Sequence, residues 1–158
     1  MNKSALIDKI IKALRSELET YVRAANSSHE EATAEENRAE NKYDTRGLEA
    51  SYLATGQANK VMELEDAIGA FEDLKAKSFD DSPIDVGALV ELDQNGEKAF
   101  YFIGPNAGGT EITDGVHEVL VITPQSPIGT QLQGQQQGDR LELTLAGAKQ
   151  LIQIVNVC

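Results

Sequence analysis

Cysteine is nearly absent from this chain of 158 residues, in which the only one is Cys158. A single cysteine excludes a disulfide framework and a cysteine-based zinc site within one chain. No run of about 18 apolar residues occurs, so we expect no membrane span. The N-terminal stretch MNKSALIDKIIKALRSELET places acidic side chains among apolar ones, a pattern that a secretory signal does not have. These absences favour a reducing cytoplasm.

Basic residues are also scarce, because 14 lysines and arginines stand against 26 acidic residues and the net charge is −12. A protein that binds DNA or RNA alone is usually basic, since neutralised phosphates supply most of the affinity. We therefore expect contact with nucleic acid only indirectly, within a larger basic machine. A simpler interpretation is that the charge only keeps the protein soluble.

Motifs for catalysis and metal binding are missing as well. The two histidines, His29 and His117, lie in different halves of the chain and form no paired metal motif. The sequence contains neither a GxxxxGK[ST] nor a GxGxxG stretch. The glycine-rich segment GPNAGGTE lies between two expected strands, so it lacks the helix N-terminus that would hold phosphate. We expect no enzyme activity and no cofactor of the protein's own.

Proline is absent from residues 1–78, a region with only three of the 13 glycines. All four prolines and the other ten glycines lie in residues 79–158. The charge balance changes at the same place. Residues 1–78 contain 15 acidic and 11 basic residues, whereas residues 79–158 contain 11 acidic and 3 basic residues. This change predicts two domains, 1–78 and 79–158, with a boundary near residues 78–85.

Two heptad-spaced seams of mostly apolar residues predict helices in the first domain. The first seam is Ile7, Ile11, Leu14, Leu18, Tyr21 and Ala25, and the second is Ala54, Val61, Leu64, Ile68 and Phe71. The polar sequence between them predicts an antiparallel coiled-coil hairpin with its tip near residues 41–49. The first helix, roughly residues 3–42, would span about 60 Å. Arg46-Gly47 is the expected turn, because glycine readily ends a helix. A compact bundle or a coiled coil between chains is the alternative.

The second domain has the pattern of short strands. Five apolar or β-branched runs carry it, at residues 86–92, 98–104, 117–123, 139–145 and 150–157. Asn95-Gly96 is typical of a type I′ hairpin turn. Ser126 and Pro127 have the residue types of a helix N-cap and first helical position, and Gly134 the type of a stop. We expect an antiparallel sheet with one short helix, which makes the chain α+β.

Acidic residues gather toward the expected hairpin tip. Glu36, Glu40 and Asp44 recur every four residues, which places them on one helical face. Carboxylate oxygens suit Mg²⁺, which usually takes one or two of them from a protein. Such a thin arm makes a poor isolated site, but it can complete a metal site whose other ligands belong to a partner. The alternative is an acidic face that is only solvated.

The segment VITPQSPIGTQLQGQQQGDRLEL closely resembles the C-terminal signature of the Gre transcript-cleavage factors of bacterial RNA polymerase. In that family a strand leads into Ser-Pro-Leu/Ile-Gly, then leucine and glycine, and then Gly-Asp before the next strand. The matching positions here are Ser126, Pro127, Ile128, Gly129, Leu132, Gly134, Gly138 and Asp139. The resemblance is strongest over residues 119–143, and it extends more loosely over nearly the whole chain.

The resemblance implies an N-terminal coiled coil followed by an FKBP-like domain without prolyl isomerase activity. It implies that the globular domain docks at the rim of the polymerase secondary channel, with Ser126, Pro127, Ile128 and Gly129 as candidate partner-binding residues. The coiled coil would enter the channel, where acids at its tip help to hold a second Mg²⁺. The polymerase then cuts backtracked RNA with its own active site. Glu40 and Asp44 are the candidate catalytic residues and ligands of that shared Mg²⁺.

The tip departs from the family pattern, which reads roughly Gly-Asp-Leu-Lys-Glu-Asn-Ala-Glu-Tyr. Alignment on LEASYLA and VMELED puts Glu40 near the family's aspartate and Tyr43 at its glutamate, with Asp44 one position later. Arg46 adds a cation nearby. Three hypotheses stay open: a cytoplasmic, monomeric factor that stimulates cleavage, a secondary-channel modulator or inhibitor that does not, and an interaction protein unrelated to polymerase with a coiled coil between chains.

Overall fold

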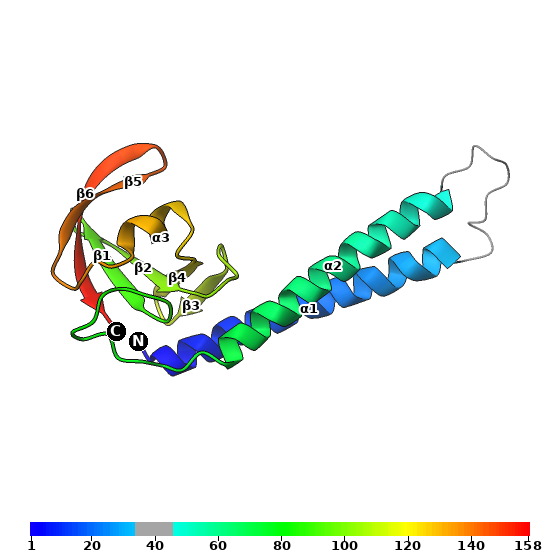
Figure 1. Ribbon diagram of the computed structural model, residues 1–158, viewed down its shortest axis with the longest axis horizontal. Helices are drawn as coiled ribbons and strands as arrows, with labels where there is room; N and C mark the ends of the chain where they lie inside the picture. Colours follow the sequence, from blue (N-terminus) through cyan, green and yellow to red (C-terminus); the bar gives the residue numbers. More distant parts are fainter. Residues whose placement is uncertain (34–45) are drawn as a thin grey trace. The chain divides into compact units, whose positions relative to one another are not determined.

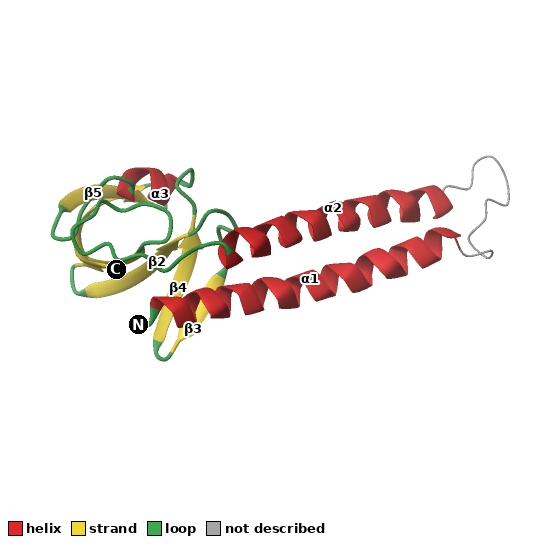
Figure 2. Ribbon diagram, turned by 60° about the horizontal axis from the view of Figure 1, so that its bottom comes forward, coloured by secondary structure: helices red, strands yellow, loops and turns green. Residues whose placement is uncertain are grey.

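The computed structural model describes residues 1–33 and 46–158, and it forms two compact units (Figures 1 and 2). One unit is Leu14–Gly69, and the other combines Met1–Ala13 with Ala70–Cys158. The predicted tip acids Glu40 and Asp44 lie outside the described residues. The helical N-terminal region and the C-terminal sheet confirm the α+β class, while the boundary expected near residues 78–85 stays a prediction.

The unit Leu14–Gly69 consists of parts of two helices, α1 (Lys3–Thr33) and α2 (Arg46–Glu72). They run side by side in opposite directions in both views (Figures 1 and 2). Leu14, Leu64 and Ile68 from the predicted seams are buried here. The turn predicted at Arg46-Gly47 is wrong, because both residues belong to α2. No helix in the described part of the chain is long and apolar enough to cross a membrane.

The other unit contains a six-stranded sheet in the order β3-β4-β2-β1-β6-β5. Its strands are β1 (Leu89–Gln94), β2 (Glu97–Ile103), β3 (Glu111–Asp114), β4 (His117–Ile122), β5 (Arg140–Leu145) and β6 (Ala148–Val157). The prediction of an antiparallel sheet is wrong at one pair, because β2 and β4 run parallel. The strand β3 was not predicted, because it has only four residues and most of them are polar. The chain crosses to β3 at the edge before β4 returns beside β2, and this crossing makes the β2–β4 pair parallel.

Two-residue turns connect the strands of the three hairpins, and in two of these turns both residues have positive φ angles. Asn95 and Gly96 have φ angles of 54° and 91°, which confirms the type I′ turn between β1 and β2. Ala146 and Gly147 connect β5 and β6 with φ angles of 50° and 80°. An alanine with a positive φ is uncommon, so the sheet pairing on both sides of the turn must impose that conformation.

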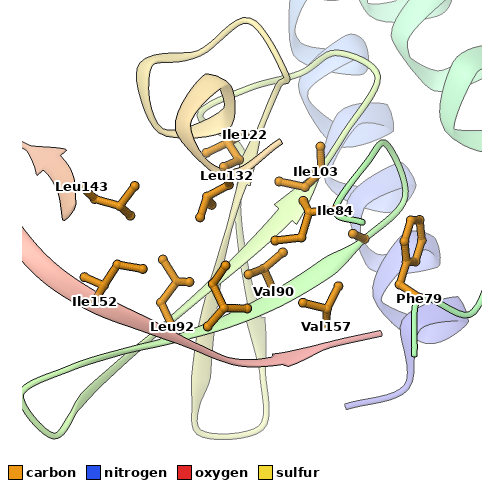
Figure 3. Packing of buried hydrophobic residues seen from close by; sticks show 12 residues of the cluster. Phe79, Ile84, Val90, Leu92, Ile103, Ile122, Leu132, Leu143, Ile152 and Val157 are labelled. Carbon is orange, nitrogen blue, oxygen red and sulfur yellow. The ribbon is translucent and has the colours of Figure 1, made fainter. Parts of the chain in front are cut away.

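One face of the sheet carries the main apolar core (Figure 3). Leu132 from the short helix α3 (Pro127–Leu132) is fully buried in it, as are Val90 from β1, Leu143 from β5 and Ile154 from β6. Burial of side chains of this size stabilises the fold by about 1.5–3 kcal/mol each. The core therefore joins the sheet and α3 into one body.

The helix ends Met1–Ala13 and 70–72 belong to the same unit as the sheet. Leu6 and Ile10 are fully buried, and the rings of Phe71 and Phe102 have centroids 6.1 Å apart. The predicted seam included Ile11 and not Ile10, because a heptad spacing describes packing against another helix alone. Lys9 Nζ also donates to Asp114 Oδ1 at 2.6 Å, which ties α1 to the β3–β4 hairpin.

Gly104 lies close to the ring of Phe71 in this packing. A Cβ added there would lie 2.8 Å from the carbonyl oxygen of Asn106 and 2.9 Å from Cζ of Phe71. We predict that Gly104→Ala lowers the free energy of unfolding by roughly 1–3 kcal/mol, the usual cost of overpacking. Urea denaturation measures it.

Gly69 provides the matched control, because an added Cβ there meets nothing within 4 Å and the residue is inside α2. Gly69→Ala should raise the free energy of unfolding by about 0.5–1 kcal/mol, the helix-propensity difference. Equal effects of the two substitutions would show that Gly104 is not under steric pressure.

Because of the Lys9–Asp114 ion pair, we predict that the free energy of unfolding depends on pH. The hydrogen bond from Lys9 lowers the pKa of Asp114 below its ordinary value of 3.8. The pair therefore stabilises the fold above pH 3.8, and this contribution is lost as the pH falls through the lowered pKa. Lys9→Met should reduce stability at pH 7, and the deficit should shrink in acid. Urea denaturation across pH tests this, and a deficit that does not change with pH would contradict it.

Candidate functional site

The structure describes one of the two predicted sites. Ser126, Pro127, Ile128 and Gly129 lie at the start of α3, whereas Glu40 and Asp44 lie outside the described residues. Within residues 1–33 and 46–158, no three His, Cys, Asp or Glu side chains are grouped to hold a metal ion. The site that can be built from contacts is therefore the segment around α3.

Ser126 caps α3 as predicted. Its backbone is extended, with φ −66° and ψ 156°, and its Oγ accepts a hydrogen bond from the backbone N–H of Gly129 at 3.0 Å. The same hydroxyl donates to the carbonyl oxygen of Thr123 at 2.7 Å. Pro127 follows at the first helical position, where the missing N–H costs nothing. Ser126 thus joins the end of β4 to the start of the helix.

Gly129 is needed for close packing rather than for an unusual backbone angle. A Cβ built on it would lie 1.9 Å from the carbonyl oxygen of Thr123 and 2.8 Å from Ser126 Oγ. Only a residue without a Cβ lets α3 lie this close to the preceding loop. The serine and glycine of the signature therefore have structural roles, and Pro127 is the exposed member of the four candidates.

Glutamines hold α3 to its neighbours, a role that the sequence analysis missed. Gln131 donates from Nε2 to the carbonyl oxygen of Pro127 at 2.7 Å and accepts at Oε1 from the N–H of Thr144 on β5 at 2.8 Å. Gln133 Nε2 lies 3.3 Å from Asp85 Oδ1. An amide side chain both donates and accepts, so it suits such bridges. The signal in the sequence is the run of glutamines around Gly134.

The second part of the signature shapes the loop that leads to β5. Gly134 and Gly138 have φ angles of 81° and 92°, a region that glycine enters without steric cost. Asp139 accepts a hydrogen bond at Oδ2 from the N–H of Gln136 at 2.7 Å. The Gly-Asp pair therefore closes the loop, and each residue that matches the family pattern here is explained by local geometry.

No protein-family model matches this chain, and no curated protein matches it. Solved structures are similar to it. The crystal structure of GreA factor homolog 1 (Gfh1) of Thermus thermophilus has 22% identity and a TM-score of 0.40, with 94% of each chain covered. Gfh1 of Thermus aquaticus has 22% identity and a TM-score of 0.41, over 95% of this chain and 92% of that one. A prokaryotic elongation factor GreA/GreB from Nitrosomonas europaea has 18% identity and a TM-score of 0.37, over 60% and 78%.

The names of these structures belong to the Gre group of proteins, which the segment from Ser126 to Asp139 resembles. At such identities and TM-scores, however, the likenesses carry no argument about the function of this chain. The function has to be argued from the residues themselves.

The cap at Ser126 and the contact at Gly129 give a stability prediction. Ser126→Ala should lower the free energy of unfolding by about 1 kcal/mol, the usual loss of an N-cap. Gly129→Ala should cost more, since it forces a Cβ against a carbonyl oxygen. Pro127→Ala is the control and should cost at most about 1 kcal/mol, because the side chain is exposed. Denaturant unfolding that gives Gly129→Ala the smallest effect of the three would contradict the packing account.

Proposed function

We propose that the chain is a Gre-like factor that binds bacterial RNA polymerase and regulates elongation. The observation that carries the proposal is the signature from Ser126 to Asp139. Its serine caps α3, its first glycine permits the close contact with Thr123, and its last two residues shape the loop before β5. Eight matching positions in one short segment support common ancestry more strongly than the overall α+β class does.

In this proposal the two parts of the chain have different tasks. The sheet and α3 form the FKBP-like domain, which docks at the rim of the secondary channel through the exposed surface around Pro127. The antiparallel helices form the coiled coil, which enters the channel as part of a monomeric cytoplasmic protein. The net charge of −12 supports contact with RNA only within the elongation complex. The protein is then not an enzyme itself, and it acts on the catalytic site of the polymerase.

The tip acids are proposed to share Mg²⁺ with the polymerase. Glu40 and Asp44 offer carboxylate oxygens, the donor type that Mg²⁺ prefers, and two such groups do not complete its coordination. The polymerase would have to supply the other ligands. A bound Mg²⁺ polarises phosphoryl oxygens and activates water for hydrolysis. The residues of this chain would add negative charge that favours the metal.

The second candidate function is modulation without cleavage. Tyr43 stands where the family pattern has a glutamate, and Arg46 adds a cation close by in the sequence. A phenol is neutral at pH 7 and is a weaker Mg²⁺ ligand than a carboxylate. A factor with this tip would enter the channel and inhibit or tune transcription.

A backtracked elongation complex of bacterial RNA polymerase separates the two. The unmutated protein should accelerate cleavage of the RNA 3′ end, and Asp44→Asn or Glu40→Gln should abolish the acceleration because each removes a charge that attracts the metal. Both variants should still compete with another secondary-channel factor for the polymerase. Glu65→Gln, an exposed acid elsewhere on α2, is the matched control and should retain full activity.

The outcomes distinguish the proposals clearly. Full activity of both tip variants would mean that these acids are only solvated. Binding of the unmutated protein without any cleavage would favour the modulator. Absence of binding would contradict the Gre-like function altogether. Docking through α3 predicts that Pro127→Ala weakens binding, while its folding stays cooperative.

A further inference from the structure

A cleft opens where the two hairpins β1–β2 and β3–β4 separate. Parallel pairing between β2 and β4 begins at Phe100 and Val119. The preceding residues pair only within their own hairpins, Lys98 with Asp93 and Glu118 with Thr113. In Figure 3 the tips of these green and yellow-green hairpins lie apart. The resulting cleft has a volume of about 460 Å³, within the range of about 300–1,000 Å³ that is usual for ligand sites.

Aromatic and apolar side chains line the cleft. Phe100 packs against the ring of His117 on the face of the sheet opposite to Tyr101, with centroids 4.6 Å apart and planes inclined by 51°. Tyr101 is half-buried beside Leu120, its partner in the β2–β4 register, and burial raises the pKa of its hydroxyl. Val116 at the lip is 91% exposed. Such surfaces suit an elongated side chain with an apolar stem.

The charge of the cleft is negative, because the lysine that lines it is paired with a carboxylate of the neighbouring strand. Lys98 Nζ is held by Glu91 Oε1 at 2.6 Å, and this hydrogen bond raises the pKa of Lys98. Glu111 and Glu118 also line the cleft and are exposed. In the described part of the chain, neither of these two carboxylates forms an ion pair with a lysine or arginine. Two uncompensated acids therefore remain in the cleft.

The two carboxylates lie on the same face of the sheet. Glu111 is directly opposite Leu120 in the β3–β4 pair, and Glu118 is two residues before Leu120 on the same strand. Side chains in such diagonal positions are roughly 7–8 Å apart at their Cα atoms. Leu120 and Tyr101 are on this face too. The arrangement is an apolar strip that ends between two carboxylates.

We propose that this cleft binds an arginine side chain presented by a partner protein. The guanidinium would bridge Glu118 and Glu111, since its planar fork of five donors suits two separate carboxylates better than a compact ammonium does. The stem would lie on Leu120, and the ring of Tyr101 would add a cation–π contact. The negative charge argues against nucleic acid as the occupant. This proposal is independent of the proposed Gre-like function.

The test uses the full chain labelled with ¹⁵N and titrated with N-acetyl-arginine amide. The chemical shifts of backbone amides should change with ligand concentration until they saturate. These changes should be confined to residues 98–101 and 111–120. The citrulline derivative, which has the same shape without the charge, should cause no saturable shift. The lysine derivative should bind more weakly than the arginine derivative.

Variants locate the site. Glu118→Gln and Glu111→Gln should each weaken binding about two- to fivefold, as expected for an exposed ion pair of up to about 1 kcal/mol. Glu142→Gln, an exposed acid on β5 at the opposite edge of the sheet, should change nothing. Equal shifts with citrulline, equal binding of lysine, or equal effects of Glu142→Gln and Glu118→Gln would each overturn the proposal.

Discussion

The close contact between Gly129 and the Thr123 carbonyl is the constraint on which the α3 segment depends. With an added Cβ only 1.9 Å from that oxygen, no other residue fits without moving the helix. The contact lets the Ser126 hydroxyl reach both Thr123 and Gly129, and it seats Leu132 in the core beside the sheet. The glutamines then fasten the helix to β5 and to Asp85. The same short signature therefore builds the fold and leaves Pro127 exposed, at the surface where we propose that a partner binds.

The two faces of the sheet pack against different elements of the same unit. One face packs on α3, and on the other Phe102 meets Phe71 from the end of α2. Because the residues Met1–Ala13 and 70–72 belong to the same unit as the sheet, the start of α1 is a part of the globular body. The parallel pairing of β2 and β4 begins only at Phe100 and Val119, so the two hairpins diverge toward the first residues of these strands. That divergence creates the cleft, so the crossing that the sequence analysis missed also produces the proposed arginine site.

Local chemistry decided what could be predicted from the sequence. The Asn95-Gly96 turn and the Ser126 cap were predicted because each depends on the conformations and hydrogen bonds of a few neighbouring residues. Long-range pairing was not predictable in the same way. The strand β3 has four residues and little apolar pattern, and the direction of β4 depends on where β3 lies. The burial of Ile10 in place of Ile11 reflects packing outside a coiled coil. The candidate roles of Glu40 and Asp44 rest on their carboxylate chemistry and on the resemblance, and they stay predictions.

The central claim is that this protein works inside a bacterial RNA polymerase. A cryo-electron microscopy structure of the full chain bound to a backtracked elongation complex tests it most directly. The account predicts the paired helices within the secondary channel, residues 40–44 beside the catalytic Mg²⁺, and the surface around Pro127 at the channel rim. Helices that lie outside the channel, or a globular unit that contacts the polymerase through another face, would contradict it.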